Sequence, residues 1–169
     1  CIDENGIVTI PSTIPVTLVE GEAAENYKVI AIKDNVFSGN TVIKAVKIED
    51  NVQKIGASSF QDCTNLAMVE LPSTLTTIGT GAFDGCSSLT DVISNITDND
   101  AISKIALSLP NATLYVPNDE TKNNCKDAGW DFANIFVGSR IKTLVDGLNY
   151  VCATGDKTAI VIVAKEGYD

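Results

Sequence analysis

Residues 63–92 read CTNLAMVELPSTLTTIGTGAFDGCSSLTDV, and this stretch repeats one pattern of apolar residues at a spacing of 23. Within it, the first members Cys63, Leu66 and Val69 return as Cys86, Leu89 and Val92. Over residues 29–97 the same spacing gives five columns in three copies, namely Val29/Val52/Leu75, Ile32/Ile55/Ile78, Phe37/Phe60/Phe83, Ile43/Leu66/Leu89 and Val46/Val69/Val92. A fixed period of this length predicts a solenoid built from stacked coils.

Each copy combines a short strand with a return turn. In the middle copy, Leu66, Val69 and Leu71 follow an LxxLxL pattern whose last two apolar side chains alternate as a strand requires. Pro72 should end that strand, because proline cannot donate to a ladder. The segments GASSFQDC and GTGAFDGC predict tight turns with an inward phenylalanine. One coil cannot bury its own apolar side, so coils about 4.8 Å apart should stack and pair their strands.

The motif LTTIGTGAFDGCSSLTDV resembles the BspA-like leucine-rich repeats of surface proteins from anaerobic gut and oral bacteria and some protozoan parasites. It keeps almost all of that family's I-G-x-x-A-F-x-x-C-x-x-L-x-x-V signature. Four departures suggest edge copies: Asn40 in place of Cys, Val36 and Ser59 in place of Ala, and Ser94 in the last strand. The resemblance implies an α/β or mostly β fold, a leucine-rich-repeat solenoid of 23-residue coils with a parallel β-sheet on one face and short helices in the C-terminal cap.

The flanks extend this organisation to the whole chain. We expect an N-terminal β cap in residues 1–28, three repeats in 29–97, a C-terminal cap in 98–140 and, in 141–169, a β-hairpin that resembles the start of a further module. IPSTI at 10–14 repeats LPSTL at 71–75, so IVTIP should start the ladder one coil early, and residues 15–28 should be an insert.

The C-terminal cap should close the exposed end of the last coil, as terminal repeats require. Its final strand is expected to end at Pro117, and a short helix then leads to Trp130, which covers the coil or, alternatively, stacks on a sugar. Before that strand, Asp98 should cap a short amphipathic helix that SLPN at 108–111 stops. The apolar side of this helix should hold Ile102, Ile105 and Ala106.

The composition argues against several classes of function. Twelve Lys and Arg against 22 Asp and Glu give a net charge of −10 without a basic run, so nucleic acid is not an expected partner. The longest apolar run, residues 159–164, falls well short of the roughly 20 residues of a membrane span. Without His, the usual general base and the His-paired nucleophiles are missing, so we expect neither an enzyme nor a cofactor.

The five cysteines form no CxxC pair, which together with the lack of His argues against a metal site. Cys63 and Cys86 occupy one repeat column among apolar residues, where we expect buried free thiols rather than a disulfide. Cys1 has two interpretations, the lipid-bearing first residue of a lipoprotein or a point where the chain was cut.

The side chains that alternate with the inward valine column should face outward on the sheet. They form two rows of candidate ligand-binding residues: Ala45, Met68 and Asp91, and Lys47, Glu70 and Ile93. Leucine-rich repeats commonly hold ligands on such rows, because a rigid sheet presents side chains without an ordering cost. The equally weighted alternative is a merely solvated face.

The resemblance implies a noncatalytic protein of the cell surface or the extracellular space, with lipid anchoring to an outer membrane as one arrangement. Its role would be adhesion or protein–protein recognition, with a host matrix or cell-surface protein as the partner. The alternative is a glycan-binding accessory module of a polysaccharide-utilisation system. The aromatic candidates for glycan contact are Tyr27, Tyr115, Trp130, Tyr150 and Tyr168.

Overall fold

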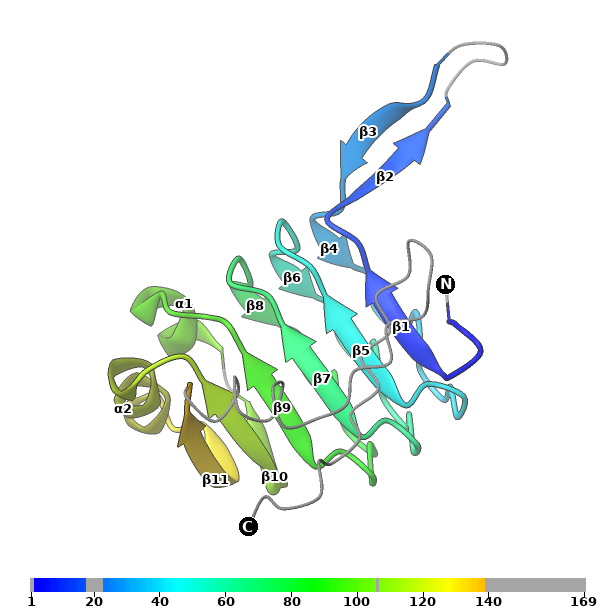
Figure 1. The fold of residues 1–169 in the computed structure, drawn as a ribbon. Coiled ribbons are helices and arrows are strands. Elements are labelled where there is room, and N and C mark those ends of the chain that lie inside the picture. The colour runs from blue at the N-terminus through cyan, green and yellow to red at the C-terminus, as the bar shows by residue number, and fades with distance from the viewer. Residues whose placement is uncertain (1, 18–22, 106, 139–169) are drawn as a thin grey trace, which may run out of the picture.

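The computed structural model describes residues 2–17, 23–105 and 107–138, and these form a stack of coils (Figure 1). The front of the stack is a six-stranded sheet in which all neighbouring strands are parallel. Its strands, in spatial order, are β1 (Ile7–Ile10), β5 (Ala45–Ile48), β7 (Met68–Leu71), β9 (Asp91–Ser94), β10 (Ser108–Val116) and β11 (Asp131–Val137). The predicted solenoid with a parallel sheet on one face is confirmed, in a mostly β form.

A second, smaller ladder runs behind this sheet. It consists of β4 (Ala31–Ile32), β6 (Lys54–Ile55) and β8 (Thr77–Ile78), paired in parallel at the repeat spacing. The return turns that follow are also linked, since Phe37 N donates to Ser59 O and Phe60 N to Ala82 O, each at 2.8 Å. The first coil (residues 29–51) is therefore joined to the second (52–74), and the second to the third (75–97), by backbone hydrogen bonds at the front and at the back.

The interior contains the apolar columns predicted from the repeat. The rings of Phe37 and Phe60 stack with centroids 5.1 Å apart, and those of Phe60 and Phe83 with centroids 5.5 Å apart. Each member of the column Val46, Val69 and Val92 is buried. The three phenylalanines are therefore in register, and each layer covers the apolar side of its neighbour.

The N-terminal segment adds a strand and a hairpin to the first coil. Ile7 pairs with Ala45 in parallel, so the strand that starts the ladder one coil early is confirmed. The insert that follows is an antiparallel hairpin of β2 (Thr13–Val16) and β3 (Glu25–Lys28), which projects beyond the end of the stack in Figure 1.

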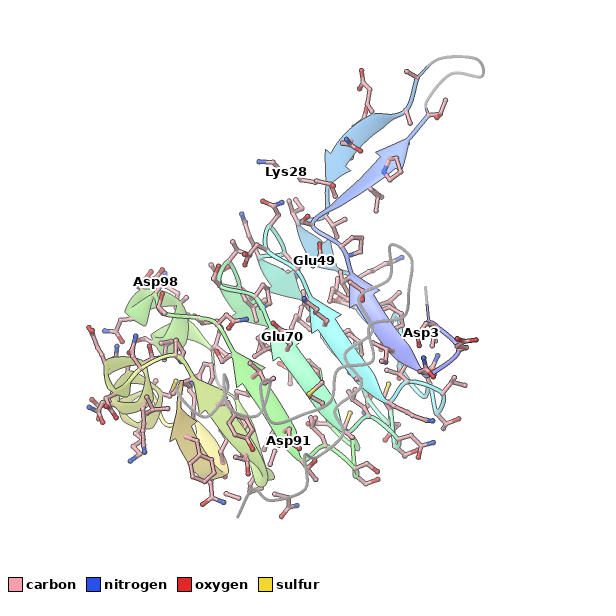
Figure 2. The ribbon with its side chains drawn as sticks, viewed as in Figure 1. Asp3, Lys28, Glu49, Glu70, Asp91 and Asp98 are labelled. Carbon is pink, nitrogen blue, oxygen red and sulfur yellow. The ribbon has the colours of Figure 1, made fainter. Side chains whose placement is uncertain are left out.

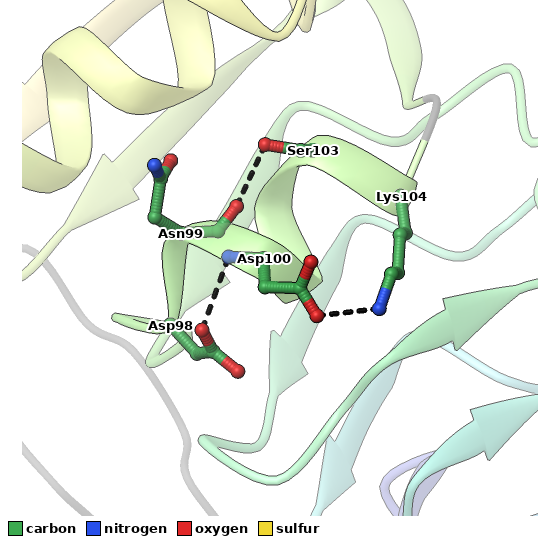
Figure 3. A network of polar contacts seen from close by, with 5 residues as sticks. All are labelled: Asp98, Asn99, Asp100, Ser103 and Lys104. Carbon is green, nitrogen blue, oxygen red and sulfur yellow. Dashed lines mark hydrogen bonds and ion pairs between the residues drawn. The ribbon is translucent and has the colours of Figure 1, made fainter.

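The expected helix after the third coil is present as α1 (Asn99–Lys104). Asp98 Oδ1 accepts a hydrogen bond of 3.0 Å from Asp100 N, and Lys104 forms an exposed ion pair with Asp100 (Figure 3). Ile102 and Ile105 are buried as expected, whereas Ala106 lies outside the described residues.

The helix ends at Lys104, so it stops before residues 108–111 are reached, and these residues belong to β10, which begins at Ser108 and runs through Pro110. The pairing of β10 with β11 shifts register between Leu109 and Thr113, and its pairing with β9 begins at Thr113. Pro110 therefore lies where the ladder is interrupted, and its missing N–H costs no strand pairing.

The C-terminal cap contains one more strand than predicted. After β10 ends at Val116, α2 (Asp119–Asp127) leads to β11, which pairs in parallel with β10. Trp130, which directly precedes β11, is 5% exposed, and its Nε1 donates to Ile102 O at 3.1 Å. Trp130 therefore covers the end of the core, and the alternative that it stacks on a sugar is wrong. The expected hairpin in 141–169 and the question of Cys1 lie outside the described residues.

Candidate functional site

The structure brings the six predicted residues together on the outward face of the front sheet, in two rows that cross the strands. Ala45, Met68 and Asp91 are direct neighbours in one row, and Lys47, Glu70 and Ile93 in the other. All six are half-buried, while the residues that alternate with them in β5, β7 and β9 are buried. Figure 2 shows Glu70 and Asp91 on adjacent strands. The rows exist as predicted, and their binding role stays a prediction.

Both rows are longer than the sequence analysis indicated. The register adds Ile7 and Thr9 from β1, Thr113 and Tyr115 from β10, and Asn134 and Phe136 from β11. The repeated IPSTI motif could have extended the rows to β1. The residues of β10 and β11 carried no such signal, because this part of the chain departs from the 23-residue spacing.

The added residues change the chemistry of the face along the stack. The row that begins with Thr9, Lys47 and Glu70 continues with Ile93, Tyr115 and Phe136, so its polar part is followed by an apolar part. The rings of Tyr115 and Phe136 stack with centroids 5.9 Å apart, and Tyr115 is 9% exposed. The expectation of Tyr115 as an exposed aromatic candidate is therefore wrong.

The charged part of the face contains both signs. Lys47 and Glu70 are cross-strand neighbours, and Asp91 lies beside Met68 in the other row. Asn95 Nδ2 donates to Glu70 Oε1 at 3.3 Å, which restrains this carboxylate. The face therefore carries both signs of charge next to Ile93, whose cross-strand neighbour Tyr115 is buried.

At the back of the stack, glycine lets the main chain of one coil pack directly against the main chain of the coil before it. A Cβ on Gly56 would lie 2.5 Å from Asp34 N, and one on Gly79 would lie 2.3 Å from Ala57 N. Within residues 2–17, 23–105 and 107–138 no coil precedes the first one at this point, and the first coil carries Lys33 in the same column. This close stacking fixes the spacing of the strands that hold the two rows.

The cysteine column is a second link between coils. Cys63 Sγ donates to Phe37 O at 3.1 Å, and Cys86 Sγ donates to Phe60 O at 3.0 Å. Both are free thiols, as expected, and Cys63 is buried, whereas Cys86 is half-buried. Burial raises the pKa of Cys63 and raises that of Cys86 to about 12, so both stay protonated donors and are poor nucleophiles at neutral pH.

Ser59 is one of the four departures from the family signature that were interpreted as signs of edge copies, and for this residue the interpretation is wrong. It lies in the second coil, between two neighbours, and is 0% exposed. Its Oγ is buried without a hydrogen-bond partner in the part of the chain that the structure describes. The hydroxyl therefore destabilises a position where Ala82 of the third coil is purely apolar.

Residues 2–17, 23–105 and 107–138 contain no group of three or more His, Cys, Asp or Glu side chains placed to hold a metal ion. None of the helices in these ranges is long and apolar enough to cross a membrane.

A parallel sheet in front, return turns behind and apolar columns at a spacing of 23 define a leucine-rich-repeat protein. The family model for the BspA type leucine rich repeat region, a unit of six copies, matches residues 24–116, which is more than half of the 169-residue chain. The chain therefore belongs to the BspA-type leucine-rich-repeat family.

Two solved structures are similar to this chain. A leucine rich repeat protein from T. pallidum has a TM-score of 0.43 and 22% identity, over 73% of this chain and 56% of its own. A leucine rich cell surface protein from Faecalibacterium prausnitzii A2-165 has a TM-score of 0.38 and 18% identity, over 79% of this chain and 44% of its own. The chain thus spans about half the length of each structure. A comparison with curated protein sequences found no match.

Proposed function

We propose that this chain is a noncatalytic recognition module of a cell-surface or secreted bacterial protein, and that the outward face of its front sheet binds a protein partner in adhesion. The observation that supports this most directly is the registration of Ala45, Met68 and Asp91 beside Lys47, Glu70 and Ile93 on one continuous sheet. Membership of the BspA-type family is consistent with this role.

The rigidity of the face favours binding. Strand pairing and close coil contacts already fix the backbone below each row, so a partner would not have to order it. Lys47, Glu70 and Asp91 would set specificity by charge, while the flexible thioether of Met68 and the side chain of Ile93 would supply apolar contact.

The test reverses charge on the face. The double variant Glu70→Lys and Asp91→Lys should weaken binding at least about tenfold in surface plasmon resonance against a panel of purified host-matrix and cell-surface proteins, since like charges would then face the partner's cations. The matched control Asp84→Lys and Asp127→Lys makes the same change in net charge at two exposed positions in a return turn and in α2. Equal affinity of both double variants would refute the proposal.

The glycan-binding alternative has less structural support than the sequence suggested. Trp130 and Tyr115 are buried, whereas Tyr27 on β3 is 40% exposed and is the aromatic candidate left among the described residues. Tyr150 and Tyr168 lie outside them. If the alternative held, a glycan array would show signal that is reduced by Tyr27→Ala and unaffected by the face variant.

A further inference from the structure

The two edges of the front sheet differ in how well their inward side chains are covered. One inward column crosses all six strands, and its members from β1 to β10 are at most 1% exposed, namely Val8, Val46, Val69, Val92 and Leu114. Ile135, the member on β11, is half-buried. Val8 also lies in an edge strand, but Ile2 forms an antiparallel bridge with it and packs against the core. The β11 edge is therefore the less covered end of the column.

The strand β11 lacks the features with which proteins commonly protect a sheet edge, which are a very short strand, proline or lysine. It has seven residues, and neither proline nor lysine is among them. Phe132, Ile135 and Val137 on this strand are half-buried and pack against the core. In the part of the chain that the structure describes, β11 pairs with β10 alone and ends the sheet (Figure 1). Such an edge favours the addition of another strand.

The sequence that follows β11 predicts a pair of strands. Residues 148–154 (LNYVCAT) and 157–163 (KTAIVIV) are separated by Gly155 and Asp156, and this pattern is typical of a hairpin with a two-residue turn. The turn would make three cross-strand pairs on one face, Leu148 with Val163, Tyr150 with Val161 and Cys152 with Ala159. One face of the hairpin would then be entirely apolar, and an isolated hairpin of this kind is marginally stable in water.

The length of the connection determines the direction of the first arm, residues 148–154. Residues 138–147 separate it from β11, whereas a parallel connection needs a dozen or more residues. The parallel neighbours β9 and β10, for example, are joined by the longer segment 95–107. The first arm would therefore run antiparallel to β11. Pairing of Leu148 with Val137 would then place Tyr150 beside Ile135, so that the apolar face of the hairpin continues the inward face of the sheet.

We propose that residues 148–154 pair with the outer edge of β11 as an antiparallel strand and that residues 157–163 pair with them in turn. The hairpin covers Ile135 and Val137 and extends the front sheet beyond the third coil and its cap. The start of the chain offers a precedent, because the antiparallel bridge between Ile2 and Val8 places a neighbour on the outer edge of β1.

The connection also favours this hairpin over a second copy of the chain or another protein. A tether of this length gives the hairpin an effective concentration at β11 on the order of 1 mM, without any new contact. A separate molecule would have to reach a similar concentration to compete for the same edge.

Hydrogen exchange of the 169-residue chain, followed by mass spectrometry, tests the proposal. Val151→Pro removes a backbone donor from the middle of the first arm and should speed exchange in the peptide covering β11 at least about tenfold. Tyr150→Asp, which places a charge on the apolar face of the hairpin, should have the same effect. The matched control Thr143→Pro changes the connection and should leave exchange in β11 as it is in the parent.

Exchange in β7 shows whether a variant has destabilised the whole stack, and it should be the same in all four proteins. The proposal is overturned if β11 exchanges equally fast in the parent and in Val151→Pro and Tyr150→Asp. It is also overturned if protection of β11 in the parent rises with protein concentration, because a second copy would then occupy the edge. Neither result affects the proposed binding of a partner through Glu70 and Asp91.

Discussion

The first and second coils follow one sequence pattern but meet different neighbours. The second coil has a coil on each side, so Phe60 is 0% exposed and Gly56 lies against the backbone of the first coil. At the back of the stack the first coil has a described neighbour on one side, so Phe37 is half-buried and Lys33 takes the position that glycine holds in the other two coils. The comparison shows that the residue required at a column depends on the adjacent coil as much as on the coil that carries it.

The largest expected difference in stability between the two coils comes from removing a stacked ring. Phe60→Ala should lower the free energy of unfolding by about 4 kcal/mol, because the ring is fully buried between two others, while Phe37→Ala, with one neighbouring ring, should cost about 2 kcal/mol. Urea unfolding measures both. Equal losses would mean that the end coil is packed as tightly as the middle coil.

The next largest effect on stability is expected at the column that holds Lys33, Gly56 and Gly79. Gly56→Ala places a methyl group against Asp34 N and should destabilise the protein by about 2 kcal/mol. Lys33→Ala at the same column of the first coil should change stability by less than about 0.5 kcal/mol. Thermal or urea unfolding of the pair checks this, and a similar cost at both positions would contradict the assignment of Lys33 to an open end.

A smaller effect, of opposite sign, is expected at Ser59. Ser59→Ala removes a buried hydroxyl that lacks a partner and should stabilise the protein by about 1 kcal/mol. Ser87→Ala, at an exposed serine in the third coil, is the control and should stay within about 0.5 kcal/mol. A loss of stability at Ser59 would indicate that its hydroxyl has a partner after all.

The smallest effect is a pH dependence of the cysteine column. Burial raises the pKa of Cys86 from 9.0 to about 12, so between these values the unfolded thiol has lost its proton while the folded thiol keeps it. Stability is therefore fully present below about pH 9 and falls as pH rises toward about 12. Cys86→Ala should make this decline shallower in urea unfolding at successive pH values, and an unchanged slope would argue against a buried thiol.

The repeat itself was predictable, because each stacked layer needs the same apolar residue types. Phe37, Phe60 and Phe83 recur at one spacing for that reason, and the outward rows followed from the strand alternation around Val69. The helix cap at Asp98 was also predictable, because its side chain accepts a hydrogen bond from a residue two positions away and does not depend on tertiary contacts.

The parts that were missed depend on contacts distant in sequence. The strand β11 carries no repeat spacing, and without it neither the stacking of Phe136 on Tyr115 nor the length of the rows could be inferred. Pro110 suggested a break in secondary structure. The strand accommodates this proline because the pairing of β10 with β11 shifts register there, which the sequence alone does not reveal. Ser59 was interpreted as a sign of an edge copy from its residue type alone. Its effect on stability instead depends on its position between two coils, where its hydroxyl is buried.

The first coil carries Lys33 at the position where the second and third coils carry Gly56 and Gly79, and this difference gives the coils a fixed order. A gene that lengthens this protein can duplicate the second or third coil in place, because each carries the glycine that lets it pack against the coil before it. A duplicate of the first coil inserted in the middle would bring a lysine stem against the main chain of the layer before it. Growth of the array is therefore possible by duplication of its second or third coil, but not of its first.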